Sequence, residues 1–339
     1  MSTIVIVGAG MMGSGICFPA SDNGNEIRLV GTPYDKEVIA RVKTDGFHPR
    51  LGMNLPDGVT AWYYEEMEQA FDGMEMIVSG VPSFGVEWFA ENVLVKVKDD
   101  VKVLSLTKGL QEDAHGALLP ISSYYANVLS PERKLSINSI GGPCISMELC
   151  QKRHTTVALC GDDIRDLQWI QSLLQTPYYH INLTLDVPGI ECAVALKNAY
   201  AVGVSLAIGF AETHGEQLFN PQASLFGQAV REMLRFTKIM GGHTDAVIYA
   251  TSDLYVTIAG GRNRKLGELL GQGLTFKEAM QKLSGVTLES VSIITRAARS
   301  VRRWAEQGRV TLDDYPLLLH LDAIINGDEP VSIPWKLFG

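Results

Sequence analysis

Short apolar runs, rich in β-branched residues, alternate with helical patterns over the first half of the chain. Runs of this kind are typical of strands that are buried on both faces of a sheet. We expect strands at residues 3–7, 25–31, 74–82, 101–109, 135–143 and 155–161. Strands that alternate with helices predict parallel βαβ units, and hence an α/β, Rossmann-like, doubly wound sheet. Ligands of such a sheet bind at the carboxyl ends of its strands.

The pattern changes at VPG, residues 187–189, beyond which apolar positions recur with a mainly helical period. We expect helices at residues 190–212, about 222–241, 244–254, 264–272, 275–284 and 287–307. A chain of 339 residues exceeds the size at which one hydrophobic core usually keeps growing. The sequence therefore predicts a Rossmann-like domain over residues 1–187 and an all-α domain over residues 188–339.

Composition narrows the class of function. Apolar residues make up 46% of the chain and charged residues 20%, which is ordinary for a soluble enzyme. The formal charge of −9, without a Lys/Arg cluster, argues against a nucleic-acid partner and favours a small substrate. The five cysteines and seven histidines lack disulfide or metal-ligand spacing, so we expect free thiols, no metal and a cytoplasmic location. The N-terminal pattern and the short uncharged run Ala199–Ala211 predict neither a signal peptide nor membrane insertion.

Gly8, Gly10 and Gly13 form a GxGxxG motif between an expected strand and an expected helix. In dinucleotide-binding folds the first glycine permits a tight turn, the second lets a pyrophosphate approach the backbone, and the third packs the helix on the strand. Amides at the helix N-terminus, where Met11 and Met12 stand, then face the phosphates. The motif predicts a dinucleotide site, with a purely structural glycine turn as the alternative.

The residues after the second and third strands bear on the choice of cofactor. NAD sites usually carry an acid after the second strand to hold the ribose hydroxyls, whereas this chain has Gly31 and Thr32. Nothing at these positions repels a 2′-phosphate, so NADP is slightly favoured over NAD, although Asp35 can still reach the ribose. Pro82, in the GVPS sequence after the third strand, either shapes the floor under the nicotinamide ribose or forms a plain turn.

Lys197 stands in the middle of an almost entirely apolar helical segment, residues 189–212. Its neighbours at helical spacing are apolar or small, so the segment is expected to be buried on most sides. Burial disfavours a charged amine, which suits a group that exchanges a proton with a carbonyl oxygen near neutral pH. The alternatives are a lysine neutralised by a buried carboxylate such as Glu191 and one whose amine reaches solvent. We favour the catalytic interpretation.

Other charged residues follow strands and turns. Lys108 ends the fourth expected strand at the ligand-binding edge, although a lysine at such a place is more often exposed than catalytic. Asp253 precedes a Gly-Gly turn, after which Arg262 and Asn263 open a helix. A guanidinium beside helix N-terminal amides can hold a phosphate. The alternative is a capped helix with solvated basic residues.

Six motifs, in this order and at these separations, give the chain a family resemblance: GAGMMG, SLTKGL, GGPCISMEL, ALKN, SDLYVT and GGRNRKLGELLGQG. The set resembles the NAD(P)-dependent glycerol-3-phosphate dehydrogenases over nearly the whole chain. NGNEIRLVGTPYD and HPRLG, residues 48–52, are especially similar to the archaeal-type branch.

The resemblance implies a role for each matching residue. Lys197 is the proton donor or acceptor, Lys108 contacts both cofactor and substrate, and Asp253 orients the lysine and the substrate hydroxyls. Arg262 and Asn263 hold the substrate phosphate, and Arg262 also approaches the cofactor. The remaining cofactor contacts that it implies are Gly142, Ser146 and Glu289. The chain departs from the family pattern at Cys144, Ser146, Ser252, Gly261 and Ser290.

The activity that the resemblance implies is the reversible, NAD(P)H-dependent reduction of dihydroxyacetone phosphate to glycerol 3-phosphate, with lysine as general acid and base. One alternative keeps the fold but reduces another phosphorylated ketose or a 2-keto acid, as ketopantoate reductases do. A further alternative is a cofactor-sensing module without turnover. The apolar all-helical domain also makes a homodimer plausible.

Overall fold

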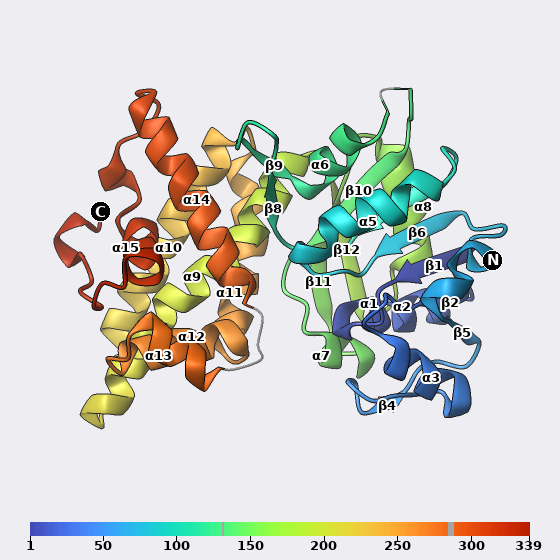
Figure 1. Cartoon of the computed structure of the whole chain (residues 1–339), viewed down its shortest axis with the longest axis horizontal. Coiled ribbons are helices and arrows are strands. Elements are labelled where there is room, and N and C mark those ends of the chain that lie inside the picture. Colours follow the sequence, from blue (N-terminus) through green and yellow to red (C-terminus); the bar gives the residue numbers. More distant parts are fainter. Residues whose placement is uncertain (131, 284–287) are drawn as a thin grey trace. The chain divides into compact units, whose positions relative to one another are not determined.

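A computed structural model of the chain describes residues 1–130, 132–283 and 288–339 (Figure 1). The described residues divide into two compact units. The first consists of Met1–Lys108 and Pro120–Val187, and the second of Gly109–Leu119 and Pro188–Gly339. Each unit has hydrophobic clusters of its own.

An eight-stranded sheet forms the centre of the first unit, in the order β12-β11-β10-β7-β6-β1-β2-β5. Its strands are β1 (Thr3–Val7), β2 (Glu26–Val30), β5 (Val59–Trp62), β6 (Met76–Ser79), β7 (Lys102–Ser105), β10 (Ser136–Gly141), β11 (Thr155–Cys160) and β12 (Tyr179–Thr184). Every strand expected from the sequence is present, and β5 and β12 extend the two edges. Neighbouring strands pair in parallel except β10 and β11, which pair antiparallel. The expected parallel pairing therefore holds for most of the sheet, and the antiparallel pair is a feature that the strand pattern did not predict.

Helices cover both faces of this sheet, as a doubly wound fold requires. Alternate residues of β1 point to opposite faces: Ile4 and Ile6 belong to one hydrophobic cluster, and Val5 and Val7 to another. The helices of the unit are α1 (Met11–Gly15), α2 (Cys17–Asp22), α3 (Lys36–Asp45), α4 (Met67–Ala70), α5 (Val86–Asn92), α6 (Ile121–Val128), α7 (Ser146–Cys150) and α8 (Ile164–Leu174). A small hairpin of β3 (Phe47–His48) and β4 (Met53–Asn54) follows α3. These features confirm the predicted fold class.

The second unit is built around the helix α9 (Val187–His214). Packed with it are α10 (Phe219–Ile239), α11 (Val247–Ile258), α12 (Arg262–Gly271), α13 (Phe276–Lys282), α14 (Glu289–Glu306) and α15 (Pro316–Gly327). VPG does not interrupt the chain as expected: Val187 and Pro188 lie in the first turn of α9, where proline fits a helix. The sequence did not predict the helix α15. The predicted end of the helix 275–284 and the predicted start of the helix 287–307 lie outside the described residues.

The helix α9 is, among the described residues, long and apolar enough to cross a membrane. Its most apolar 18-residue window is 83% buried inside the protein. The shortness of the run Ala199–Ala211 is therefore not a valid argument against membrane insertion, because the helix continues well beyond this run. Burial instead identifies α9 as a core helix of its unit.

The strands β8 (Leu110–Glu112) and β9 (Leu118–Pro120) form a hairpin that the sequence placed within residues 1–187. The structure groups Gly109–Leu119 with the second unit. Leu110 and Leu118 are members of the helical core. From α14, Arg296 donates to the carbonyl oxygen of Leu110 at 2.6 Å, and Arg299 pairs with Glu112 at 3.0 Å. These contacts attach the hairpin to α14, although its sequence lies far from that helix.

Three glycines bring α12 into backbone contact with α9. A Cβ on Gly267 would lie 2.3 Å from the carbonyl oxygen of Val202, and one on Gly271 would lie 2.1 Å from that of Leu206. From the other side, a Cβ on Gly209 would lie 2.1 Å from the carbonyl oxygen of Glu268. No real Cβ approaches a backbone atom so closely. The two helices can therefore pack at this distance only because glycine occupies all three positions.

Glu232 is a fully buried carboxylate in this helical core. It accepts hydrogen bonds from the amides of Leu317 and Leu318 at the start of α15, from Tyr200 and from Gln228. Burial raises the pKa of Glu232 to about 7, against the effect of these donors. Because its oxygens cap a helix N-terminus, we assign it a structural role.

We predict that Gly267→Ala destabilises the protein by about 3 kcal/mol, because the added methyl group forces α12 away from α9. Gly227→Ala is the matched control, since Gly227 lies inside α10 with no atom within 4 Å of an added Cβ. There the change should stabilise by about 0.5–1 kcal/mol through helix propensity. Urea unfolding of both variants measures the difference, and equal effects would contradict the packing described above.

Candidate functional site

The glycine motif of the first unit has the geometry expected of a dinucleotide loop. Gly8 adopts φ +112°, and a Cβ there would lie 2.8 Å from the carbonyl oxygen of Gly80. A Cβ on Gly13 would lie 2.1 Å from the carbonyl oxygen of Gly8. At Gly10 the nearest atom to an added Cβ is 3.9 Å away, so the surface above it is open. The first and third glycines thus serve packing, and the second leaves room for a ligand.

The helix α1 begins directly after Gly10, which is its N-cap. The side chains of Met11 and Met12 pack against the core of the unit. Their amides lie in the first turn, where a helix leaves N–H groups without partners inside the helix. Open space at Gly10 beside these amides fits a pyrophosphate, so the residues present suit the predicted NAD(P) cofactor.

Asp35 is turned toward the protein rather than toward a ribose. One carboxylate oxygen accepts from the amide and the hydroxyl of Thr32, at 3.0 and 2.7 Å, and from the amide of Ala9 at 3.3 Å. The other oxygen pairs with Arg50 at 3.1 Å. The Asp35 side chain is 7% exposed and that of Arg50 is 47% exposed. In this arrangement the guanidinium of Arg50 is half-exposed, whereas the carboxylate of Asp35 is bound by groups of the loop.

His48 lies beneath the same loop and is fully buried; in the sequence it stands out only as the first residue of HPRLG. Its Nε2 is 2.9 Å from the Ser14 hydroxyl and 3.2 Å from the carbonyl oxygen of Ala9. Its Nδ1 accepts from the amide of Leu51 at 3.1 Å. Burial lowers the pKa of His48. His48 and Arg50 both belong to the HPRLG sequence, which therefore supports the glycine loop from below.

The other predicted residues of the first unit lie where strands end. Lys108, after β7, donates from Nζ to the carbonyl oxygen of Gly142, after β10, at 2.8 Å. Pro82, after β6, is exposed, and Ser146 begins α7 with its side chain buried. The structure thus brings Lys108 and Gly142 into direct contact, at the sheet edge where ligands of this fold bind.

Lys197 of α9 is held by two groups from α11. Its Nζ lies 3.3 Å from a carboxylate oxygen of Asp253 and donates to the hydroxyl of Thr257 at 2.9 Å. The Thr257 hydroxyl in turn donates to the carbonyl oxygen of Asp253, one turn earlier, at 2.7 Å. The side chains of Lys197 and Asp253 are 12% and 3% exposed. A buried ammonium is thus paired with a buried carboxylate, as its desolvation requires.

Asn198 connects three elements beside this pair. Its side-chain oxygen accepts from Asn263 of α12 at 2.9 Å, and its amide nitrogen donates to Glu289 of α14 at 3.3 Å. The asparagine is buried. This chain of contacts fixes the predicted residues Asn263 and Glu289 next to the helix that carries Lys197.

These residues line a cavity of about 170 Å³ in the second unit. Its lining consists of Lys197, Asn198, Thr257, Gly260, Gly261, Arg262, Asn263 and Glu289. Arg262 is exposed at the N-terminus of α12, directly after Gly261, which adopts φ +97°. A buried amine, a guanidinium and helix N-terminal amides thus share one small space. That combination can protonate an oxygen and bind a phosphate.

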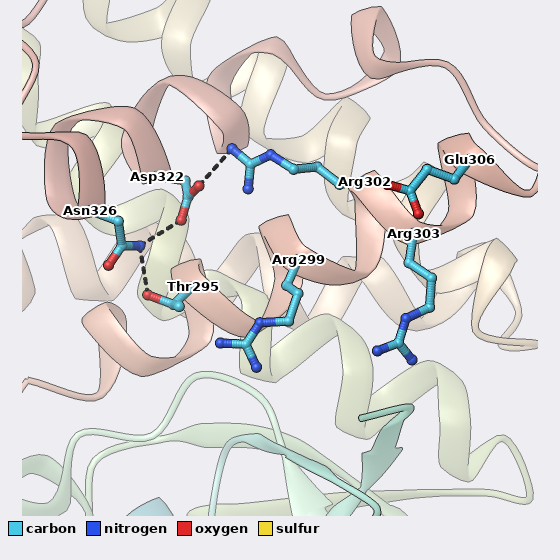
Figure 2. Close-up of a pocket in the computed structure, with 7 residues that line it drawn as sticks. All are labelled: Thr295, Arg299, Arg302, Arg303, Glu306, Asp322 and Asn326. Carbon is cyan, nitrogen blue, oxygen red and sulfur yellow. Dashed lines mark hydrogen bonds and ion pairs between the residues drawn. The ribbon is translucent and has the colours of Figure 1, made fainter. Parts of the chain in front are cut away.

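A larger hollow, of about 570 Å³, lies elsewhere on the second unit. Figure 2 shows Arg302 of α14 paired with Asp322 of α15, with Arg299 and Arg303 pointing to another side. Asn326 links the helices further by donating to Thr295 and Asp322. None of the predicted site residues lines this hollow. The smaller cavity is the candidate site, because the groups with suitable chemistry converge there.

Sequence reasoning did not assign roles to Thr257, Asn198, His48 or Arg50. A signal existed for Thr257, which follows Asp253 by four residues and so lies on the same face of its helix. The hydrogen bonds of Asn198 and the contact of His48 with Ser14 join residues 34 to 91 positions apart, and no local pattern reveals such contacts.

Comparison with known protein families matches both halves of the chain. Residues 3–165 match the model of the NAD-dependent glycerol-3-phosphate dehydrogenase N-terminus, and residues 186–335 match that of the C-terminus. Together the two matches cover most of the chain and confirm the resemblance seen in its motifs.

Individual relatives carry the same family name. The NADP(+)-dependent glycerol-3-phosphate dehydrogenase of Archaeoglobus fulgidus is 32% identical over 282 residues, covering 83% of each chain. A glycerol-3-phosphate dehydrogenase [NAD(P)+] of Shouchella clausii is 27% identical over 349 residues, covering 100% of this chain and 96% of the relative. The crystal structure of glycerol-3-phosphate dehydrogenase from Coxiella burnetii superposes with a TM-score of 0.81 at 21% identity, covering 99% and 97% of the two chains.

We predict that Thr257→Val lowers kcat about tenfold, because Lys197 loses a hydrogen bond that fixes its amine. Thr251→Val is the matched control: Thr251 lies on the same helix and makes the same type of bond to the carbonyl four residues earlier, outside the cavity. Steady-state rates of both variants test the prediction. Equal activity in the two would show that Thr257 does not position the amine.

Proposed function

The chain belongs to the family of NAD-dependent glycerol-3-phosphate dehydrogenases, and on that premise we propose that it reduces dihydroxyacetone phosphate to glycerol 3-phosphate with NAD(P)H, reversibly. The observation that carries the proposal is the cavity lined by both Lys197 and Arg262, with Asp253 paired to the lysine. A bound nicotinamide supplies the hydride that this reduction needs. The residues of the chain bind the two reactants and move the proton.

Lys197 is the general acid of the reduction. As the substrate C2 carbon gains a hydride, its carbonyl oxygen becomes an alkoxide and takes a proton from Nζ of Lys197. In the reverse direction the neutral amine accepts that proton. Asp253 and Thr257 hold the amine in place, one by an ion pair and the other by a hydrogen bond. An ammonium that is already fixed in place stabilises the developing charge without reorganisation.

Arg262 and Asn263 bind the substrate phosphate. The guanidinium can donate two parallel N–H groups to phosphate oxygens, and the first amides of α12 add further donors. The protein carries a net charge of −9, so this local positive charge offsets an unfavourable overall field for an anionic substrate. Lys108 is assigned a contact to the cofactor, which its bond to Gly142 supports.

The cofactor of this chain is NAD(P), and we propose that NADP(H) is preferred. The support is the pair formed by Asp35 and Arg50. The carboxylate that could hold a 2′-hydroxyl is occupied by the loop, whereas the half-exposed guanidinium beside Thr32 offers donors to a 2′-phosphate. A homodimer and a cytoplasmic location remain predictions of the sequence.

We predict that NAD(P)H oxidation occurs with dihydroxyacetone phosphate and is lost with unphosphorylated dihydroxyacetone and with ketopantoate. Arg262→Ala should raise KM for dihydroxyacetone phosphate about 10- to 100-fold, because charge-assisted hydrogen bonds to the phosphate are removed. Initial rates measure both effects. Lys265→Ala, which removes an exposed charge from the same helix, is the control.

Turnover of another phosphorylated ketose in place of dihydroxyacetone phosphate would change the assigned substrate but leave the proposed mechanism intact. Turnover of ketopantoate alone would favour a 2-keto acid reductase. Cofactor binding without turnover of any carbonyl would favour a sensing module.

We predict that Arg50→Ala raises the KM for NADPH about tenfold or more and leaves the KM for NADH within about twofold, because only NADPH carries the 2′-phosphate. Arg41→Ala is the charge-matched control, since Arg41 is exposed on α3 and pairs with Asp45. An equal loss with both cofactors would instead indicate that the variant disturbs the loop through Asp35.

A further inference from the structure

Ala9, between the first two glycines of the motif, is held from both sides by buried side chains. Its amide donates to Asp35 at 3.3 Å, and its carbonyl oxygen lies 3.2 Å from Nε2 of His48. Asp35 follows β2, and His48 ends β3, so the two groups come from different elements. Gly8 and Gly13 are fixed by close backbone contacts. The methyl group of Ala9 is buried in the core, and in addition two side chains bond to its backbone amide and carbonyl groups.

The hydrogen bonds of His48 define one protonation state. The carbonyl oxygen of Ala9 can only accept, so Nε2 must carry a hydrogen. The amide of Leu51 can only donate, so Nδ1 must be bare. Each partner independently requires the same neutral tautomer, with the Ser14 hydroxyl as a second neighbour of Nε2.

We propose that His48 is a positioning residue for cofactor binding, which acts through the carbonyl oxygen of Ala9 and only as the neutral Nε2–H tautomer. The proposal rests on the cofactor site described above. The peptide group that follows Ala9 contains the amide of Gly10, so rotation of the Ala9 carbonyl turns this amide as well. Gly10 is the open position of the loop and the N-cap of α1. Holding the carbonyl therefore sets the direction of the amides that meet the pyrophosphate.

Acid should weaken the hold on Ala9 indirectly, by releasing the opposite side of the imidazole ring from Leu51. A protonated imidazole would direct an Nδ1–H at the amide of Leu51 and lose that hydrogen bond. Burial opposes protonation of His48, and so does the positive charge of Arg50. The hydrogen bond to Ala9 and the negative charge of Asp35 favour protonation. The net pKa of His48 is lowered. The contribution of neutral His48 to the stability of the folded protein is therefore fully present above the ordinary imidazole pKa of about 6.5. It is lost as the pH falls below that value toward the pKa of His48 in the folded protein.

Two variants separate the two nitrogens of the ring. In His48→Gln the side-chain amide nitrogen replaces Nε2 and can donate to Ala9. In His48→Asn the side-chain oxygen replaces Nδ1 and can accept from Leu51, but nothing reaches Ala9. We expect His48→Asn to raise the Kd for NADP+ about tenfold and His48→Gln to remain within about twofold of the unchanged protein. Tryptophan fluorescence quenching at pH 8, without substrate, measures both.

The pH profile gives a second readout. Between pH 8 and pH 5 the unchanged protein should lose more affinity for NADP+ than His48→Gln, which has no titratable group at this position. The 2′-phosphate of the cofactor titrates in both proteins, so the ratio of their Kd values removes its effect. A ratio that stays constant with pH would overturn the role of the neutral tautomer.

Equal affinities of the Asn and Gln variants, whether both weak or both normal, would overturn the proposal, because a merely structural histidine does not distinguish them. Thermal unfolding identifies a variant that has lost its fold, in which case Ser14→Ala combined with His48→Gln serves as the second test of the Nε2 contact. Binding is measured without a carbonyl substrate. Failure to reduce dihydroxyacetone phosphate would therefore contradict the proposed function and leave this proposal standing.

Discussion

The close contact of α12 with α9 is the constraint on which the second unit depends. Gly209, Gly267 and Gly271 let one helix backbone lie against the other at distances that no side chain allows. Because α12 approaches so closely, Asn263 near its N-terminus reaches Asn198 of α9. The phosphate-binding end of one helix is thereby fixed beside the amine-bearing turn of another. Glycines far from the chemistry thus determine the dimensions of the cavity.

The first unit also relies on close backbone packing at glycines, here for the predicted cofactor. Gly8, Gly13 and Gly80 bring the ends of β1 and β6 and the start of α1 together through backbone contacts. Side chains then fix the direction of backbone groups, as Asp35 does by accepting a hydrogen bond from the amide of Ala9. In both units glycine sets the distance, and a few buried polar groups set the direction. Buried polar groups suit this role because each must find its partner or cost free energy.

The structure shows where three of the departures from the family pattern lie. Ser252 is exposed on α11 and bonds back to the carbonyl oxygen of Ile248, away from the cavity. Gly261 adopts φ +97°, a conformation that glycine reaches without strain, and it leads into Arg262. Ser146 is buried at the start of α7.

The sequence by itself determined the fold class and the family and proposed most of the charged groups of the candidate site, because period, glycine spacing and motif order are local properties. It could not determine that β11 runs antiparallel to β10, that residues 109–119 pack on α14, or that Thr257 and Asn198 complete the cavity. It also left Asp35 free to hold a ribose, whereas the fold directs that carboxylate to Ala9 and Arg50. Such outcomes depend on which side chains meet across long separations, and only tertiary packing brings those partners within hydrogen-bonding distance.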